Sequence, residues 1–232
     1  MSRISRVFQS TNWKYAIGEI LLIVVGVSIA LAASSWYDNR QRTDAETRML
    51  EALHEALETD LASLQDWHDD VSRYLRRLRI LAEEINPGQS CSEAAIANLG
   101  AVSAFRYIHI NTGPYEALKS QGLDLISDQS LRMKIVNWYD SDWPDLMLTM
   151  QVGYNFSLHH STPYMLENFA RPGEGQWIPI DNDICGSDPK LHNLVVYRIG
   201  SLESFEIPDY ALAIASVQDV LAEIKSALGS GD

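Results

Sequence analysis

The sequence has few cysteines and few basic side chains for its length. Its 232 residues include two cysteines, Cys91 and Cys185, which are far apart and form no C-x-x-C pair. Neither a thioredoxin-like redox motif nor a zinc knuckle is therefore indicated. The 18 lysines and arginines against 31 acidic residues give a formal net charge of -13. Because such a chain repels phosphate backbones, we expect no nucleic acid among its partners.

The sequence signatures of common enzymes are also missing. No G-x-S-x-G, Walker phosphate loop or H-E-x-x-H motif occurs. We therefore predict no catalytic residues, no metal and no cofactor, and expect the chain not to be an enzyme. His159 and His160 are adjacent, so on a helix they point in different directions and lack the i, i+4 spacing of paired metal ligands.

One acidic segment resembles the opening of a calcium loop. Asp181 and Asp183 stand at its first and third positions, and Gly186 stands at the sixth. Cys185 and His192 then occupy positions where calcium needs oxygen ligands. An ordinary acidic loop is therefore the favoured interpretation.

A single long apolar run extends from Tyr15 to Ala33. A transmembrane helix needs about 20 mostly apolar residues. Aromatic residues flank the run, with Trp13 and Tyr15 before it and Trp36 and Tyr37 after it, as at the two interfaces of a membrane. We predict one transmembrane helix over residues 15–37.

Residues 1–14 would then form a short segment before the helix, and residues 38–232 a helical domain after it. Lysines and arginines are nearly balanced between the two flanks, but the leading segment has no acidic residue. We therefore predict a cytoplasmic N-terminus and a periplasmic or exterior domain. A cleaved signal peptide is the alternative, because Ala30-Leu31-Ala32 has the form of a cleavage site. The run is longer than the usual apolar part of a signal peptide, about 7–15 residues, which favours a retained anchor.

Glu19 is an ionisable residue inside the predicted span, where a charge is costly and marks a candidate functional site. On a helix it shares a face with Gly26, Ala30 and Ala33, and Gly26, Ala30 and Ser34 follow a small-x-x-x-small pattern. This pattern predicts helix–helix assembly, either a homo-oligomer or a complex with a partner membrane protein. Two alternatives stay open: a carboxylate that reaches the near interface alone, and a role in proton or ion transfer.

After the span, residues 38–85 have the pattern of one long amphipathic helix that Asn86-Pro87-Gly88 ends. The apolar stripe favours packing on the rest of the domain over a coiled coil. Its members, spaced by three or four, are Leu50, Leu53, Leu57, Leu61, Leu64, His68, Val71, Leu75, Leu78, Ala82 and Ile85.

The remaining residues predict an all-α domain. Ser90 and Ser127 are expected to cap two helices, and Pro144 is expected to open or kink another that reaches about Phe169. The prolines, glycines and aspartates of residues 171–190 predict a long loop. Two helices, over residues 191–206 and 208–228, are expected to close the chain.

The two cysteines could pair in an oxidising compartment. Cys91 precedes a predicted helix and Cys185 lies in the predicted loop, so a disulfide between them would tie that loop down. On the amphipathic helix, Arg73, Arg76, Arg77 and Arg79 form a basic cluster. We expect these arginines to pair with acidic side chains around them rather than to bind a ligand.

Two stretches resemble a bacterial family of single-span membrane proteins of unknown function, the domain-of-unknown-function family 6090. One runs from Lys14 to Leu31, followed by Trp36 and Asn39-Arg40, and the other from Tyr115 to Arg132, followed by Trp138-Tyr139. The resemblance implies a retained span, a bacterial inner membrane and a helical domain. It implies no activity, because none is established for the family.

The sequence therefore predicts a membrane-anchored helical scaffold or accessory subunit that works by protein–protein interaction. A sensory or ligand-binding domain outside the cytoplasm is the first alternative, and an enzyme without a recognisable motif is the second. The bilayer and a second protein are the expected partners.

Overall fold

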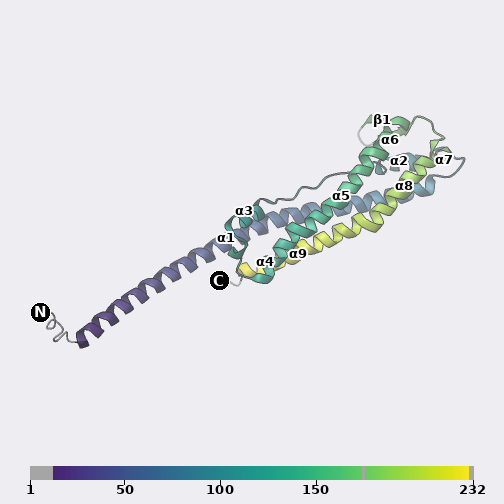
Figure 1. Ribbon diagram of the computed structural model, residues 1–232. Coiled ribbons are helices and arrows are strands. Elements are labelled where there is room, and N and C mark those ends of the chain that lie inside the picture. Colours follow the sequence, from purple (N-terminus) through teal and green to yellow (C-terminus); the bar gives the residue numbers. More distant parts are fainter. Residues whose placement is uncertain (1–12, 174–175, 230–232) are drawn as a thin grey trace, which may run out of the picture. The chain divides into compact units, whose positions relative to one another are not determined.

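A computed structural model of the protein describes residues 13–173 and 176–229, with side chains from Ile17 onward (Figure 1). Residues 1–12 of the predicted leading segment and the side chains of Trp13 and Tyr15 lie outside the described residues. The chain divides into two compact units, Met1–Arg48 and Met49–Asp232. Helix α1 (Trp13–Glu84) contributes residues to both units.

The first unit contains the predicted span. Its helix is long and apolar enough to cross a membrane and lies near the N-terminus. Every side chain from Ile17 to Asp44 is exposed, including Ile20, Leu22 and Ile29. Exposed apolar side chains around the whole circumference are expected of a helix that lipid surrounds.

The second unit is helical and buries the predicted stripe of α1. Leu53, Leu57 and Leu78 are fully buried, and the stripe packs against the rest of the same unit. The sequence pattern missed Trp67, which is 1% exposed and meets the ring of Tyr210 edge-on, with centroids 6.3 Å apart. The fold class is all-α as predicted, with one small two-stranded sheet among the described residues.

Two further long helical stretches pack beside the part of α1 that belongs to the second unit. The first joins α4 (Gln129–Asn137), η3 (Trp138–Asp142), α5 (Trp143–Phe156), η4 (Ser157–Ser161) and α6 (Thr162–Asn168). The second joins α8 (Pro189–Ser201), η5 (Leu202–Glu206) and α9 (Ile207–Gly229). The two stretches run antiparallel, since Lys134 pairs with Glu223 near one end and Tyr164 bonds to Asp188 near the other.

Three π-helical segments, η3, η4 and η5, keep these stretches continuous through prolines. Each segment ends two residues before a proline, namely Pro144, Pro163 and Pro208. A proline inside an α-helix lacks an N–H group and clashes with the carbonyl four residues earlier. The wider π turn, in which the N–H bonds five residues back, accommodates the ring without ending the helix. Pro144 therefore lies within a continuous helical stretch.

After two short helical segments that follow α1, a long connection runs back along α1. Helix α2 (Glu93–Asn98) and η1 (Leu99–Ala101) lead into residues 102–112, which have no regular structure. Arg106 lies 3.3 Å from a carboxylate oxygen of Asp66, and the Asn111 N–H donates to Asp60 Oδ1 at 2.9 Å. Helix α3 (Gly113–Gln121) and η2 (Leu123–Leu125) follow.

The predicted loop over residues 171–190 is more ordered than the sequence indicated. Strands β1 (Phe169–Gly173) and β2 (Gln176–Pro179) form an antiparallel hairpin, and α7 (Ile184–Ser187) follows. A disulfide joins Cys91 to Cys185, with Cα atoms 5.0 Å apart. The Cys91 N–H also donates to the carbonyl of Asn182 at 2.7 Å, so this segment is held to the start of α2.

Two predicted helix caps were wrong by one or two residues. Ser92, not Ser90, caps α2 by accepting a hydrogen bond from the Ala95 N–H. Asp128, not Ser127, caps α4 and accepts from two N–H groups. Ser92 and Asp128 each have the extended backbone that a cap requires.

Candidate functional site

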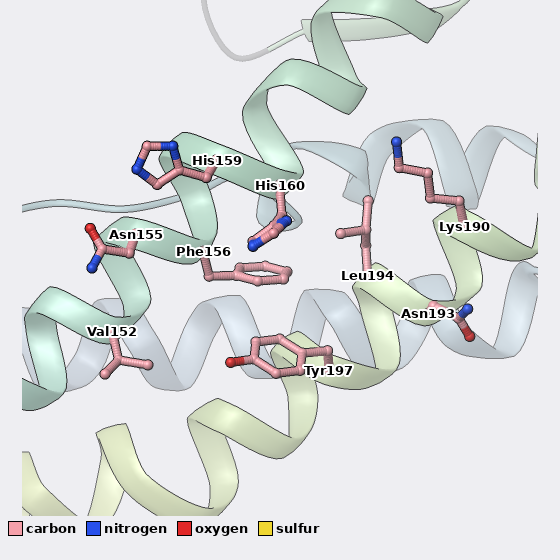
Figure 2. A pocket seen from close by; sticks show the side chains of 9 residues that line it. All are labelled: Val152, Asn155, Phe156, His159, His160, Lys190, Asn193, Leu194 and Tyr197. Atoms are coloured by element: carbon pink, nitrogen blue, oxygen red, sulfur yellow. The ribbon is translucent and has the colours of Figure 1, made fainter.

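An open groove lies between the α5–η4 stretch and α8, with a volume of about 580 Å³ (Figure 2). Both walls are helical, so their backbone positions are fixed by the bundle. The lining side chains are mostly apolar or aromatic, with basic groups added: Val152, Asn155, Phe156, His159, His160, Lys190, Asn193, Leu194 and Tyr197.

Stacked aromatic rings form the middle of the groove. Phe156 from α5 and Tyr197 from α8 stack with centroids 4.6 Å apart and planes 26° apart. The ring of His160 lies beside Phe156, with centroids 6.0 Å apart (Figure 2). Phe156 is buried, whereas Tyr197 is 51% exposed, so the buried phenylalanine ring supports the exposed tyrosine ring. Offset stacking of this kind adds about 0.5–1.5 kcal/mol beyond the burial of the rings.

The π segment η4 supplies both histidines. His159 and His160 are exposed and both line the groove, and Figure 2 shows their side chains leaving the helix in different directions. Polar contacts stabilise the segment: the Ser157 hydroxyl donates to the carbonyl of Ser103 at 3.1 Å, and Ser161 donates to the carbonyl of Ser157.

A buried ion pair lies directly behind the groove. Arg198 follows Tyr197 in α8 and donates to both carboxylate oxygens of Glu206. Each partner is 2% exposed. Ser201 also donates to Glu206 Oε1, at 3.1 Å. A Cβ atom on Gly153 would lie 3.1 Å from Glu206 Oε1, so the glycine permits the carboxylate to approach α5.

The rim of the groove is basic. Lys190 places its ammonium group 5.2 Å from the ring centre of Tyr164. The Tyr164 hydroxyl donates to Asp188 at 2.7 Å, and burial together with this bond raises the pKa of Tyr164. Asp188 is also the cap of α8, where it accepts from the Lys190 N–H at 2.8 Å.

A second polar site is buried between α1 and the returning connection. Asp60 is 2% exposed, and burial raises the pKa of its carboxyl group, opposed by the hydrogen bond from Asn111. Its Oδ2 has no hydrogen-bond partner among the described residues, and neither does the hydroxyl of Tyr139. Tyr139 stacks on Tyr115 with centroids 4.4 Å apart. A buried, half-satisfied carboxylate is a source of pH-dependent stability.

The span residues that the sequence singled out lie on α1 within the first unit. Glu19, Ala30, Ala33 and Ser34 are exposed. A Cβ atom on Gly26 would meet nothing within 4 Å. Within that unit this face is uncovered, so it is free to receive a second helix. Assembly through it stays a prediction.

The calcium-like segment consists of residues that bond to the chain itself. Asp183 accepts a hydrogen bond from the hydroxyl of Ser90, and Asp181 Oδ1 accepts from the Asp183 N–H at 3.0 Å. Over the residues that the structure describes, no group of three or more His, Cys, Asp or Glu side chains could hold a metal ion.

The arginine cluster of α1 makes contacts within the domain, and two of its members pair with acidic side chains. Arg73 pairs with Asp70, and Arg79 lies 2.6 Å from Glu203 of η5. Arg77 donates instead to the carbonyl of Ala97, at 2.7 Å.

No family model, curated protein or solved structure matches the chain. The resemblance to the family of single-span bacterial proteins therefore stays a prediction.

Proposed function

We propose that the protein is a membrane-anchored helical scaffold or accessory subunit whose domain binds a partner protein in the groove between α5 and α8. The stacked pair of Phe156 and Tyr197 carries the proposal. It presents an exposed aromatic face on rigid helices, beside the exposed side chain of Val152. Aromatic side chains of this kind are enriched at protein interfaces, where a few of them supply most of the binding energy.

The apolar surface extends beyond the groove along α5. Leu148 is 67% exposed and Val152 is 55% exposed, and the two lie one helical turn apart on the same face. Contiguous exposed apolar side chains on a soluble unit mark interaction surfaces more often than isolated ones do. A partner protein that covers this strip would remove it from water.

In this proposal the span anchors the protein in the membrane and takes part in its assembly. It would cross a bacterial inner membrane once, with the N-terminus in the cytoplasm and the domain in the periplasm. The face with Glu19 and Gly26 would contact a second span, from another copy or from a partner membrane protein. The oxidising environment of the periplasm also suits the disulfide between Cys91 and Cys185.

Site-specific photo-cross-linking in bacterial cells tests the groove. A photoreactive amino acid replaces Val152 in the full chain, and Val196, an equally exposed valine of α8 outside the groove lining, is the matched control position. We expect a defined protein adduct from position 152 and none from position 196. Absence of a protein adduct at position 152, or equal adducts at both positions, would contradict the proposal.

A small apolar ligand is the second candidate for the groove. Its volume of about 580 Å³ lies within the range of ligand pockets, about 300–1,000 Å³. A sensory domain of this kind would give a small-molecule adduct at position 152 in the same experiment, so the mass of the adduct separates the two candidates.

A further inference from the structure

We infer that the partner segment in this groove is an amphipathic α-helix of about three turns, with acidic side chains at the end that faces His159, His160 and Lys190. The inference rests on the proposed function and adds the chemistry of the partner. It is carried by the charge and the shape of the groove.

The groove lining lacks the acidic character of the chain as a whole. The formal net charge is -13, yet three lining residues are basic and none is acidic. Throughout residues 17–173 and 176–229, no carboxylate lies within 4.0 Å of the Lys190 ammonium or of the His160 or His159 rings. Lys190 therefore has no ion partner among the described residues and is available to pair with an acidic partner.

The acidic side chain of Asp188 stands two residues before Lys190, at the start of α8. Asp188 accepts hydrogen bonds from the hydroxyl of Tyr164 and from the N–H of Lys190. Its carboxylate is thus engaged at the start of α8, whereas the side chain of Lys190 is exposed and lies over the Tyr164 ring. An incoming carboxylate would meet the lysine from the solvent side.

The shape of the groove fits a helix. Two antiparallel helical walls leave a furrow between them, and a third helix packs into such a furrow with its axis about 8–10 Å from each wall. Exposed residues of α5 and η4 follow one face at Leu148, Val152 and His159. From Leu148 to His160 the wall rises about 18 Å, which corresponds to about 12 residues of a partner helix. Apolar residues of that helix at i, i+4 and i+7 would contact Val152, Phe156 and Tyr197.

The distribution of charge along the groove gives the partner helix a direction. His159 and His160 lie at the C-terminal end of the α5–η4 wall, and Lys190 lies at the start of α8. Because the two walls are antiparallel, these three residues lie toward one end of the groove, on its two sides, whereas Val152 lies toward the other end (Figure 2). Acidic residues are therefore expected at one end of the partner helix and apolar residues along the rest.

Synthetic peptides test this inference directly. Three fluorescent 14-residue peptides share one leucine face and differ at two end positions, which are Glu, Gln or Lys. Their affinities for the full chain in detergent are measured by fluorescence anisotropy. We expect the Glu peptide to bind at least about tenfold more tightly than the Lys peptide at low salt, with the Gln peptide between them. The difference should shrink as salt screens the charges.

Two charge reversals locate the effect. Lys190→Glu should abolish or invert the preference for the Glu peptide. Lys225→Glu, the same change at an exposed position of α9 outside the groove, should leave it intact. Equal affinity for the three peptides, no binding of the Glu peptide, or the same response to both reversals would overturn the inference.

The two experiments distinguish failure of this inference from failure of the proposed function. If position 152 gives a protein adduct in cells but the peptides show no charge preference, the groove binds a protein of a different chemistry and only this inference fails. If position 152 gives no protein adduct, the proposed function fails.

Discussion

Arg198 donates hydrogen bonds to both carboxylate oxygens of Glu206 immediately behind the stacked rings, and both side chains are 2% exposed. The pair joins the last turn of α8 to the end of η5, and Gly153 of the neighbouring α5 lies against it. Tyr197 and Val152, the residues next to Arg198 and Gly153, face the groove instead. Gly153 therefore lets the buried ion pair pack closely against the α5 wall.

Removal of one partner of this pair should destabilise the protein strongly. Glu206→Ala leaves the Arg198 guanidinium buried without a counter-charge, and we expect a loss of about 3–5 kcal/mol in the free energy of unfolding. Urea unfolding of the full chain in detergent, followed by tryptophan fluorescence, measures it. Glu203→Ala removes the partner of Arg79 in a largely exposed pair and should cost less than about 1 kcal/mol. Similar losses for both variants would contradict this account.

Two glycines in the helical stretches should respond in opposite ways to alanine. Gly153→Ala places a Cβ atom 3.1 Å from Glu206 Oε1, so the ion pair must shift, and we expect a loss of about 1–3 kcal/mol. Gly200→Ala meets nothing within 4 Å and should stabilise α8 by about 0.5–1 kcal/mol. The same unfolding measurement gives both values. A stabilised Gly153→Ala variant would show that the contact is loose.

Asp60 should make the stability depend on pH. Because its pKa is raised in the folded protein, the folded state holds the proton more tightly than the unfolded chain does. Its stabilising contribution is complete below the unfolded pKa of about 3.9, and it is lost as pH rises through the higher folded pKa.

Asp60→Asn should therefore gain stability relative to the natural protein as pH rises from 4 to 7. The gain would be about 1.4 kcal/mol for each pKa unit between the two states. Asn keeps an oxygen that can accept from the N–H of Asn111. Asp66→Asn, at an exposed position, is the control and should show little change. A constant difference across this pH range would refute the titration of Asp60.

The span should assemble through its small-residue face. If Glu19 makes a hydrogen bond to a second helix, Glu19→Leu would remove it and should weaken self-association or partner association by about three- to thirtyfold, more than Glu19→Gln does. Gly26→Leu should act in the same direction by preventing close approach of a second helix. Cross-linking in detergent reports the change. If both leucine variants assemble normally, the span is an anchor alone.

The sequence predicted those parts of the fold that depend on local chemistry. The apolar spacing of α1 and the turn at Pro87 and Gly88 predicted the end of that helix to within one residue of Glu84. These features need only neighbouring residues, so their signals are visible in the chain.

The groove could not be predicted in the same way. Its walls come from residues 152–160 and 190–197, which meet only through tertiary packing. The π segments were also missed, because a proline predicts a kink or a helix start and does not reveal that a continuous helix can absorb it. The sequence also contained no sign that His159 and His160 would line a groove.

The mass of the complex extracted from membranes in mild detergent tests the central claim, that the groove binds a partner protein. Val152→Asp places a charge in the groove, and Val196→Asp places the same charge at an equally exposed valine outside the groove lining. The account predicts that the natural protein and Val196→Asp retain a partner in native mass measurements and that Val152→Asp loses it. Complexes of the same mass for all three proteins would contradict the claim.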